Sequence, residues 1–113
     1  MSSQRQLRVA EEVRHILSEI IQRGDLPEGS LSTPVTVSRV DISPDLQNAL
    51  VFVMPLGGLH KEETLDVLKT NKWYLRKNLG QKVTLRRVPQ LHFILDETFD
   101  AAEKIDQLIK AGL

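Results

Sequence analysis

Seven basic side chains lie in one stretch of the chain that contains no acidic residue. Residues 67–95 include no Asp or Glu, although the whole chain of 113 residues has 15 basic and 15 acidic side chains. The basic residues of the stretch are Lys69, Lys72, Arg76, Lys77, Lys82, Arg86 and Arg87. Cations at this density create a local positive field even in a chain of zero net charge, and such a field attracts phosphates. The pattern therefore indicates binding to a polyanion.

The basic stretch is also compatible with two roles that involve no nucleic acid. The cations fit an ordinary solvated surface, or an interface for a protein partner with an acidic face. Trp73 and Tyr74 lie among them, and aromatic rings between cations can stack on unpaired bases. The rings can instead pack against a sheet, which we expect of Trp73, whereas Tyr74 is the better candidate for a half-exposed position.

The residues that could support catalysis are scattered. The chain has no Cys, and its three histidines form no H-x-x-x-H pair: His15, His60 and His92. The pair Gly57–Gly58 lacks the spacing of a phosphate-binding loop. The sequence therefore predicts a binding protein that is not an enzyme and that uses no metal or cofactor.

Length and composition predict one domain over residues 1–113. A hydrophobic content of 41% is sufficient for one core, and with five aromatic residues that core must be mainly aliphatic. The charged N-terminus does not resemble a signal peptide, and no apolar run approaches the roughly 18 residues that cross a bilayer. We expect a cytoplasmic protein, which the lack of Cys also fits, and a monomer.

Hydrophobic periodicity defines the first half of the fold. Residues 3–23 predict a helix with Gly24 at its C-terminal end. Its apolar stripe comprises Leu7, Ala10, Val13, Ile16, Leu17, Ile20 and Ile21. A loop over 24–34 then leads to a strand over 35–42, a turn over 43–47 and a second strand over 48–55. The apolar alternation changes phase at Ser38–Arg39, which predicts a β-bulge.

The second half contains a helix that must break. Over residues 60–79 a continuous helix would place Lys72 inside its leucine stripe, so we expect a kink at 70–72, with Gly80 ending the second piece. Residues 82–96 predict a third strand with an irregularity at Pro89, and 96–113 predict a last helix. The inner face of that last helix comprises Phe99, Ala102, Ile105, Leu108 and Ile109. Three strands with amphipathic helices indicate a two-layer α+β sandwich.

Three stretches, in order, resemble the ribosome-binding factor A family of bacterial small-subunit assembly factors. They are Arg8–Val9 in the first helix, "VTVSRVDISPDLQNALVFV" at 35–53 and "LRKNLGQKVTLRRVPQLHFILD" at 75–96. The resemblance extends over about residues 5–109. It implies an α+β, two-layer KH-like domain of the type II KH topology: a three-stranded sheet with helices packed on it. A helix-kink-helix stands in place of the G-x-x-G loop of ordinary KH domains.

The resemblance also implies a function. Family members bind the free small (30S) ribosomal subunit and its 16S rRNA, act in late maturation and processing of that RNA, support growth in the cold and are not catalytic. The chain departs from the family at the kink, where Asn71-Lys72-Trp73 replaces a common small-x-Gly triplet. Either Asn71 holds the kink in another conformation, or side chains make the contacts there.

The predicted RNA-binding residues comprise the basic stretch and two arginines of the first helix. The phosphate contacts are Lys69, Lys72, Arg76, Lys77, Lys82, Arg86 and Arg87, with Arg5 and Arg8 as weaker candidates. Binding should involve backbone and shape rather than base edges. We expect that reversing Arg76 and Lys77 to Glu weakens RNA binding without changing the melting temperature. Two alternatives remain: a generic single-stranded nucleic-acid-binding KH-like module, and a protein-binding adaptor with a basic face.

Overall fold

The computed structural model describes residues 3–97 of the chain. The helices are α1 (Gln4–Gln22), the short 3-10 helix η1 (Leu56–Gly58), α2 (Lys61–Thr70) and α3 (Lys72–Lys82). The strands are β1 (Asp25–Leu26), β2 (Gly29–Ser30), β3 (Val35–Ile42), β4 (Asn48–Pro55) and β5 (Gln90–Leu95). The helix predicted over 96–113 lies outside the described residues except for its first two positions.

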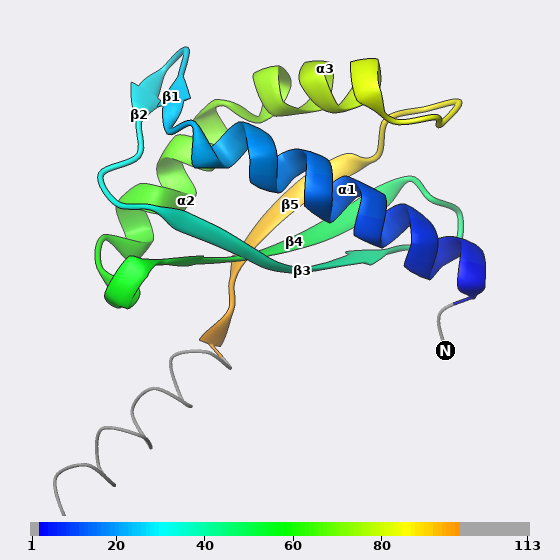
Figure 1. Ribbon diagram of the computed structural model, residues 1–113, viewed down its shortest axis with the longest axis horizontal. Coiled ribbons are helices and arrows are strands. Elements are labelled where there is room, and N and C mark those ends of the chain that lie inside the picture. The colour runs from blue at the N-terminus through cyan, green and yellow to red at the C-terminus, as the bar shows by residue number, and fades with distance from the viewer. Residues whose placement is uncertain (1–2, 98–113) are drawn as a thin grey trace, which may run out of the picture.

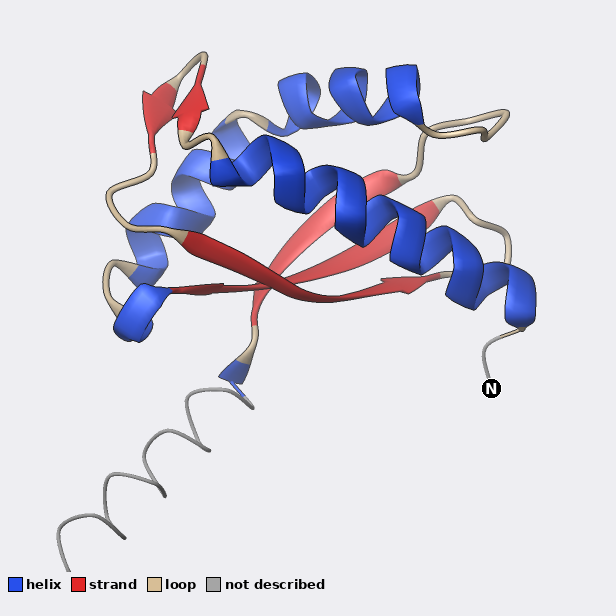
Figure 2. Ribbon diagram, in the orientation of Figure 1, coloured by secondary structure: helices blue, strands red, loops and turns tan. Residues whose placement is uncertain are grey.

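The three longer strands form one mixed sheet in the order β3-β4-β5. β3 and β4 are antiparallel, while β5 is parallel to β4 because α2 and α3 form the crossover between them. Helices α1, α2 and α3 lie on one side of this sheet (Figure 1, Figure 2). Fully buried side chains such as Leu17, Val51, Leu75 and Leu91 fill the space between the two layers. The predicted two-layer α+β architecture is confirmed for the described residues.

Helix α1 begins and ends where the sequence predicted. Ser3 and Gln6 form a capping box with hydrogen bonds of 3.1 and 2.9 Å, and Gly24 follows the helix with a φ of 74°. One part of the predicted stripe is wrong, because Leu7 is 59% exposed. Gln6, not Leu7, is seven residues before Val13 and so lies on the inner face, where its amide donates to the Ile42 carbonyl at 2.9 Å.

The strand pair β3–β4 contains the predicted bulge. Its register shifts between Val37 and Arg39, which leaves Ser38 unpaired in the ladder. The segment 24–34, predicted as a loop, contains an additional hairpin in which β1 pairs with β2. Strands of two residues are too short to show any hydrophobic alternation, so the sequence could not reveal this hairpin.

The predicted break in the second helix is confirmed at Asn71. Helix α2 ends at Thr70, and Asn71 has the non-helical dihedral angles φ −97° and ψ 15°. After the break, Leu75 and Leu79 are fully buried while Lys72 is only partly buried. The break therefore does what the periodicity required: it returns the leucines to the core and removes the lysine from it.

Two predicted boundaries after the kink are wrong. Helix α3 continues through Gly80 to Lys82, and the third strand begins at Gln90 rather than at 82. Residues 83–89 instead form a loop, which we call the arginine loop because it contains Arg86 and Arg87. Pro89 has no N–H to donate to a ladder, so pairing with β4 starts only at the residue that follows it.

Candidate nucleic-acid interface

Two adjacent hollows lie where the arginine loop, the β3–β4 turn and the start of α1 meet. The larger, of about 420 Å³, is lined by Arg5, Arg86 and Arg87 together with Asp45, Leu46, Gln47 and Leu85. The smaller, of about 370 Å³, is lined by Arg76, Arg87, Gln47, Val88 and Gln90. Because they share Gln47 and Arg87, we treat them as one surface, the arginine groove. Figure 1 shows its three contributing segments at the same end of the molecule.

Contacts with α3 hold the arginine loop in place. The Arg76 guanidinium donates from Nε to the Pro89 carbonyl at 3.2 Å and from Nη2 to the Val88 carbonyl at 3.0 Å. One helical turn further on, the loop approaches Gly80 so closely that a Cβ there would be 2.8 Å from a methyl carbon of Val88. Pro89 itself is fully buried. Gly80 and Arg76 lie on one face of α3, and their contacts fix the position of the residues that directly follow Arg87.

One carboxylate lines the arginine groove among the described residues. Asp45 accepts hydrogen bonds at Oδ1 from the Ser43 hydroxyl at 2.6 Å and from the Gln47 N–H at 3.1 Å. The Ser43 hydroxyl, assisted by the Gln47 amide, lowers the pKa of the Asp45 carboxyl below its ordinary value. Asp45 is therefore an anion that stabilises the β3–β4 turn, and it reduces the positive field of the groove.

The kink between α2 and α3 is held by a buried asparagine. Asn71 is fully buried, and its side-chain oxygen accepts from the Glu28 N–H at 2.9 Å. Its amide nitrogen donates to the carbonyls of Val67 at 2.7 Å and Glu28 at 3.2 Å. Asn71 therefore joins the tip of the β1–β2 hairpin to the kink, an arrangement that a glycine cannot provide. Of the two possibilities that the sequence left open, the structure favours Asn71 as the holder of the kink.

Trp73 lies outside the core, contrary to the prediction that it packs against the sheet. Its side chain is 53% exposed, and its Nε1–H donates to the Glu28 carboxylate at 3.1 Å. Tyr74 is half-buried as predicted, and the two ring centroids are 5.9 Å apart in an edge-to-face arrangement. The break at Asn71 rotates α3 so that Leu75 points inward, which leaves the preceding Trp73 at the surface.

The predicted cations lie on α1, at the kink between α2 and α3, along α3 and in the arginine loop. The structure brings Arg5, Arg76, Arg86 and Arg87 together around the arginine groove. Lys69 and Lys72 lie at the kink instead, while Lys77 and Lys82 are exposed on α3 and Arg8 is exposed on α1. Within residues 3–97, the ion pairs that we find do not include any of these nine cations. Their charges are therefore not cancelled by salt bridges within the described part of the chain.

The role predicted for Arg76 needs correction. Its side chain is half-buried and donates to two loop carbonyls, so reversing its charge would release the arginine loop. The expectation that the Arg76→Glu, Lys77→Glu variant keeps its melting temperature is therefore inconsistent with the structure. Sequence reasoning also missed Gln47 and Gln90, which line the groove as uncharged hydrogen-bonding groups. No spacing in the sequence could identify these two, because only the fold places the β3–β4 turn beside the start of β5.

The groove can bind phosphate through several guanidinium groups at once. Guanidinium groups match the geometry of phosphate oxygens and remain charged at any physiological pH.

In the part of the chain that the structure covers, no three His, Cys, Asp or Glu side chains gather in a way that could hold a metal ion. Nor is any helix of residues 3–97 both long enough and apolar enough to span a bilayer.

These features define a class of protein: a KH-like α+β domain with a helix-kink-helix and an arginine-lined groove. The model of the ribosome-binding factor A family matches residues 5–109, and the chain belongs to that family. A ribosome-binding factor A from Methylobacterium sp. (strain 4-46) is 47% identical over 110 residues, which cover 96% of this chain and 79% of the relative.

Structures of ribosome-binding factor A are similar in fold to this chain. The crystal structure of ribosome-binding factor A from Thermus thermophilus has a TM-score of 0.68 at 27% identity, over 80% of this chain and 94% of that one. A homology model of the T. thermophilus factor, fitted into a cryo-EM map of a 30S–RbfA complex, has a TM-score of 0.65 at 27% identity. It covers 78% of this chain and 91% of the other.

Proposed function

We propose that this protein is a ribosome assembly factor that binds the free small (30S) ribosomal subunit through its 16S rRNA. The arginine groove carries the proposal, because it gathers Arg5, Arg86 and Arg87 from two distant parts of the chain without ion-pair partners among the described residues. Membership of the family and the resemblance to the factor in the 30S–RbfA complex support the choice of partner.

The groove favours an RNA backbone over a base sequence. Its lining side chains are mainly arginines and glutamines, which suit phosphate and ribose hydroxyl groups. We infer that other cations extend the contact beyond the groove: Arg8 of α1, Lys69 at the end of α2, and Lys72, Lys77 and Lys82 of α3. Arg76 contributes its charge mainly by holding the arginine loop. The protein binds and releases RNA without catalysing a reaction on it.

The biological step that we propose is late maturation of the small subunit. A factor that holds an immature RNA helix favours one RNA fold and keeps incomplete subunits from translating. This would support 16S rRNA processing in the cytoplasm, above all in the cold, where misfolded RNA helices rearrange slowly.

A charge-reversed variant tests the groove directly. The double substitution Arg86→Glu, Arg87→Glu reverses two exposed charges without touching the core, so the melting temperature should stay within a few degrees. We expect at least a tenfold loss of affinity for purified small subunits, measured by co-sedimentation. Arg23→Glu is the control for a charge reversal outside the groove, because Arg23 is exposed at the opposite end of α1. Equal binding by the wild type and the double variant would refute the groove.

The exposed Trp73 favours one alternative, a generic single-stranded nucleic-acid-binding module. Trp73 is the only tryptophan of the chain, so its fluorescence reports its own surroundings. Stacking on an unpaired base would quench this fluorescence and make Trp73→Ala lose about 1–3 kcal/mol of binding free energy. If unstructured RNA binds as tightly as small subunits do and quenches Trp73, the generic module replaces our proposal. Binding to neither would favour a protein adaptor.

A further inference from the structure

The larger hollow of the arginine groove has apolar walls as well as cations. Leu46 of the β3–β4 turn and Leu85 of the arginine loop line it together with Arg5, Arg86 and Arg87. Both leucines pack against the core with one part of the side chain, and both are only half-buried. A ligand that consisted of phosphate alone would make no use of them. The lining therefore suits a ligand that has both an anionic part and an apolar part.

The backbone of Leu46 lies in the left-handed region, which is unfavourable for a leucine. Its φ is 61°, and its N–H donates to the Ser43 carbonyl at 2.8 Å within the turn. Glycine and asparagine adopt this conformation more readily, so the turn alone would be better made without an apolar side chain. Core packing accounts for the buried part of Leu46, and the exposed part lines the hollow. A strained residue at the edge of a hollow points to a role in binding.

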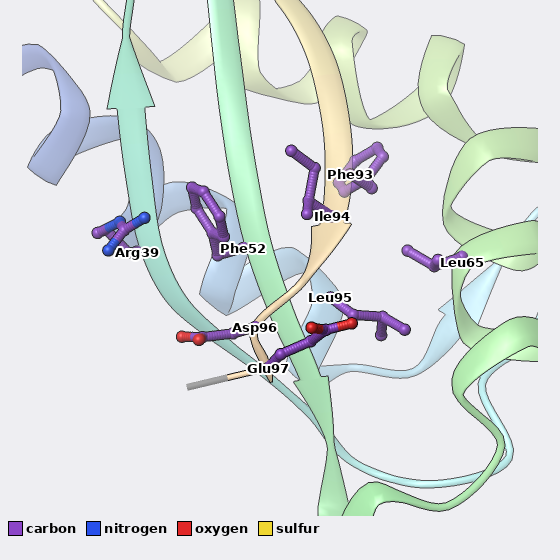
Figure 3. Close-up of a pocket in the computed structure, with 8 residues that line it drawn as sticks. All are labelled: Arg39, Phe52, Leu65, Phe93, Ile94, Leu95, Asp96 and Glu97. Atoms are coloured by element: carbon purple, nitrogen blue, oxygen red, sulfur yellow. The ribbon is translucent and has the colours of Figure 1, made fainter. Parts of the chain in front are cut away.

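A second hollow, of about 570 Å³ at the end of β5, has apolar walls but carries the opposite charge (Figure 3). Phe52 and Ile94 line it, and so do the carboxylates of Asp96 and Glu97. Its arginine, Arg39, is already engaged, because the guanidinium carbon lies 4.1 Å from the centroid of the Phe52 ring. A phosphorylated ligand would be repelled by the two carboxylates. Such a ligand therefore selects the arginine groove rather than this hollow.

An unpaired nucleotide has the parts that the larger hollow accepts. Its phosphate is the anion, and its base has two apolar faces and a polar edge. In a duplex the neighbouring bases cover these faces, so a paired strand offers the groove only sugar and phosphate. The guanidinium planes of Arg86 and Arg87 can stack on a base that is turned out of a helix. The side-chain amide of Gln47 can donate or accept, which suits any base.

We propose that the arginine groove binds one unpaired nucleotide of a folded RNA. The base lies against Leu46 and Leu85, while Arg5 binds the phosphate of the same nucleotide. The smaller hollow, which shares Arg87 with the larger one, takes the next phosphate of the strand. This inference rests on the proposed function. It adds that the protein selects a region of RNA with a bulged or single-stranded nucleotide rather than a continuous duplex.

Titration of the full-length protein with adenosine monophosphate tests the base site without any substitution. A purine ring that lies against a methyl group shifts the NMR signal of that group through its ring current. We expect the methyl signals of Leu46 and Leu85 to shift with adenosine monophosphate but not with inorganic phosphate. The methyl signals of Ile94, in the acidic hollow, are the internal reference and should not move. Equal responses of the two leucines to both ligands, including no response to either, would overturn the base site.

RNA duplexes test the selection of an unpaired nucleotide. We expect the wild type to bind a duplex with one bulged adenosine about tenfold more tightly than the same duplex fully paired. Leu46→Asn removes the apolar side chain but keeps a residue that accepts the left-handed turn, so it should fold and bind both duplexes equally. Leu85→Ala should also lose the preference. Leu59→Asn is the matched control, because Leu59 is 58% exposed in the loop between η1 and α2, and it should keep the preference.

The outcomes separate this inference from the proposed function. Equal binding of the two duplexes by the wild type would overturn the inference, and so would a preference that survives both leucine substitutions. In either case, a loss of small-subunit binding in the Arg86→Glu, Arg87→Glu variant would leave the proposed function standing. Equal binding of small subunits by the wild type and that variant would instead refute the proposed use of the groove on the subunit.

Discussion

At the scale of single residues, Asn71 shows how a side chain can take over the task of a flexible backbone. A glycine permits a kink by having no side chain, whereas Asn71 holds its kink through three hydrogen bonds to the backbones of Val67 and Glu28. Asn71 is fully buried, and its removal would take away the side-chain partner of both the N–H and the carbonyl of Glu28.

Asn71→Ala should therefore destabilise the fold. Each of the two part-buried hydrogen bonds to the Glu28 backbone contributes about 0.5–1.5 kcal/mol, and their loss should lower the free energy of unfolding, measurable by urea denaturation. Asn78→Ala is the matched control, because Asn78 donates only to the Tyr74 carbonyl of its own helix, at 2.8 Å. That variant should be neutral or slightly more stable, since Ala is the better helix former. Equal losses in both variants would show that Asn71 does not clamp the hairpin.

Asp45 belongs to the same scale and affects binding as well as stability. Because its folded-state pKa is lowered, the carboxylate stabilises the fold at pH values above its unfolded pKa of about 3.9. This contribution is lost as the pH falls through the lower, folded-state pKa. Asp45→Asn keeps an oxygen for Ser43 and Gln47 but removes the charge, so acid unfolding should become less steep in a titration followed by circular dichroism.

The Asp45→Asn variant should also bind small subunits more tightly at low ionic strength. It removes the negative charge that lines the arginine groove, and the gain should disappear as salt screens the remaining field. Weaker binding at low salt would mean that the groove does not face the RNA.

At the scale of elements, burial patterns were predictable and loop packing was not. The kink could be predicted because a continuous helix would have buried Lys72, and the bulge because the alternation changes phase at Ser38. The end of α3 could not be predicted from the sequence, because Gly80 is a packing site for Val88 rather than a helix terminus. Likewise Val83 is buried directly after α3, so its apolar character does not mark a strand.

The contact between Gly80 and Val88 predicts an unusual outcome for a helix substitution. Gly→Ala inside a helix normally adds about 1 kcal/mol of stability, but at Gly80 the new methyl group would meet Val88 at 2.8 Å. We therefore expect Gly80→Ala to bring no gain, and to weaken subunit binding by displacing the arginine loop. In a Val88→Ala background the same substitution should recover its stabilising effect. A full gain in the wild-type background would show that the loop does not rest on Gly80.

At the scale of the whole molecule, a neutral chain is divided into regions of opposite sign. Cations surround the arginine groove, whereas the acidic Glu63 and Asp66 of α2 line a separate hollow of about 300 Å³ beside the segment 30–32. Glu62 is exposed on the same helix. We therefore expect a polyanion to be attracted at the groove and repelled at this acidic hollow, which would orient the protein as well as attract it.

This division predicts how salt affects binding. Each phosphate contact lowers the logarithm of the binding constant by about 0.7–0.9 per tenfold increase in salt. Arg5→Gln and Arg87→Gln should therefore each reduce the slope of log Kd against log salt by about one, measured by titrating labelled protein with small subunits. Arg23→Gln changes the net charge by the same amount but lies outside the groove, so its slope should equal that of the wild type. If all three variants reduced the slope equally, the salt dependence of binding would come from the net charge of the protein. The arginine groove would then not be the binding surface.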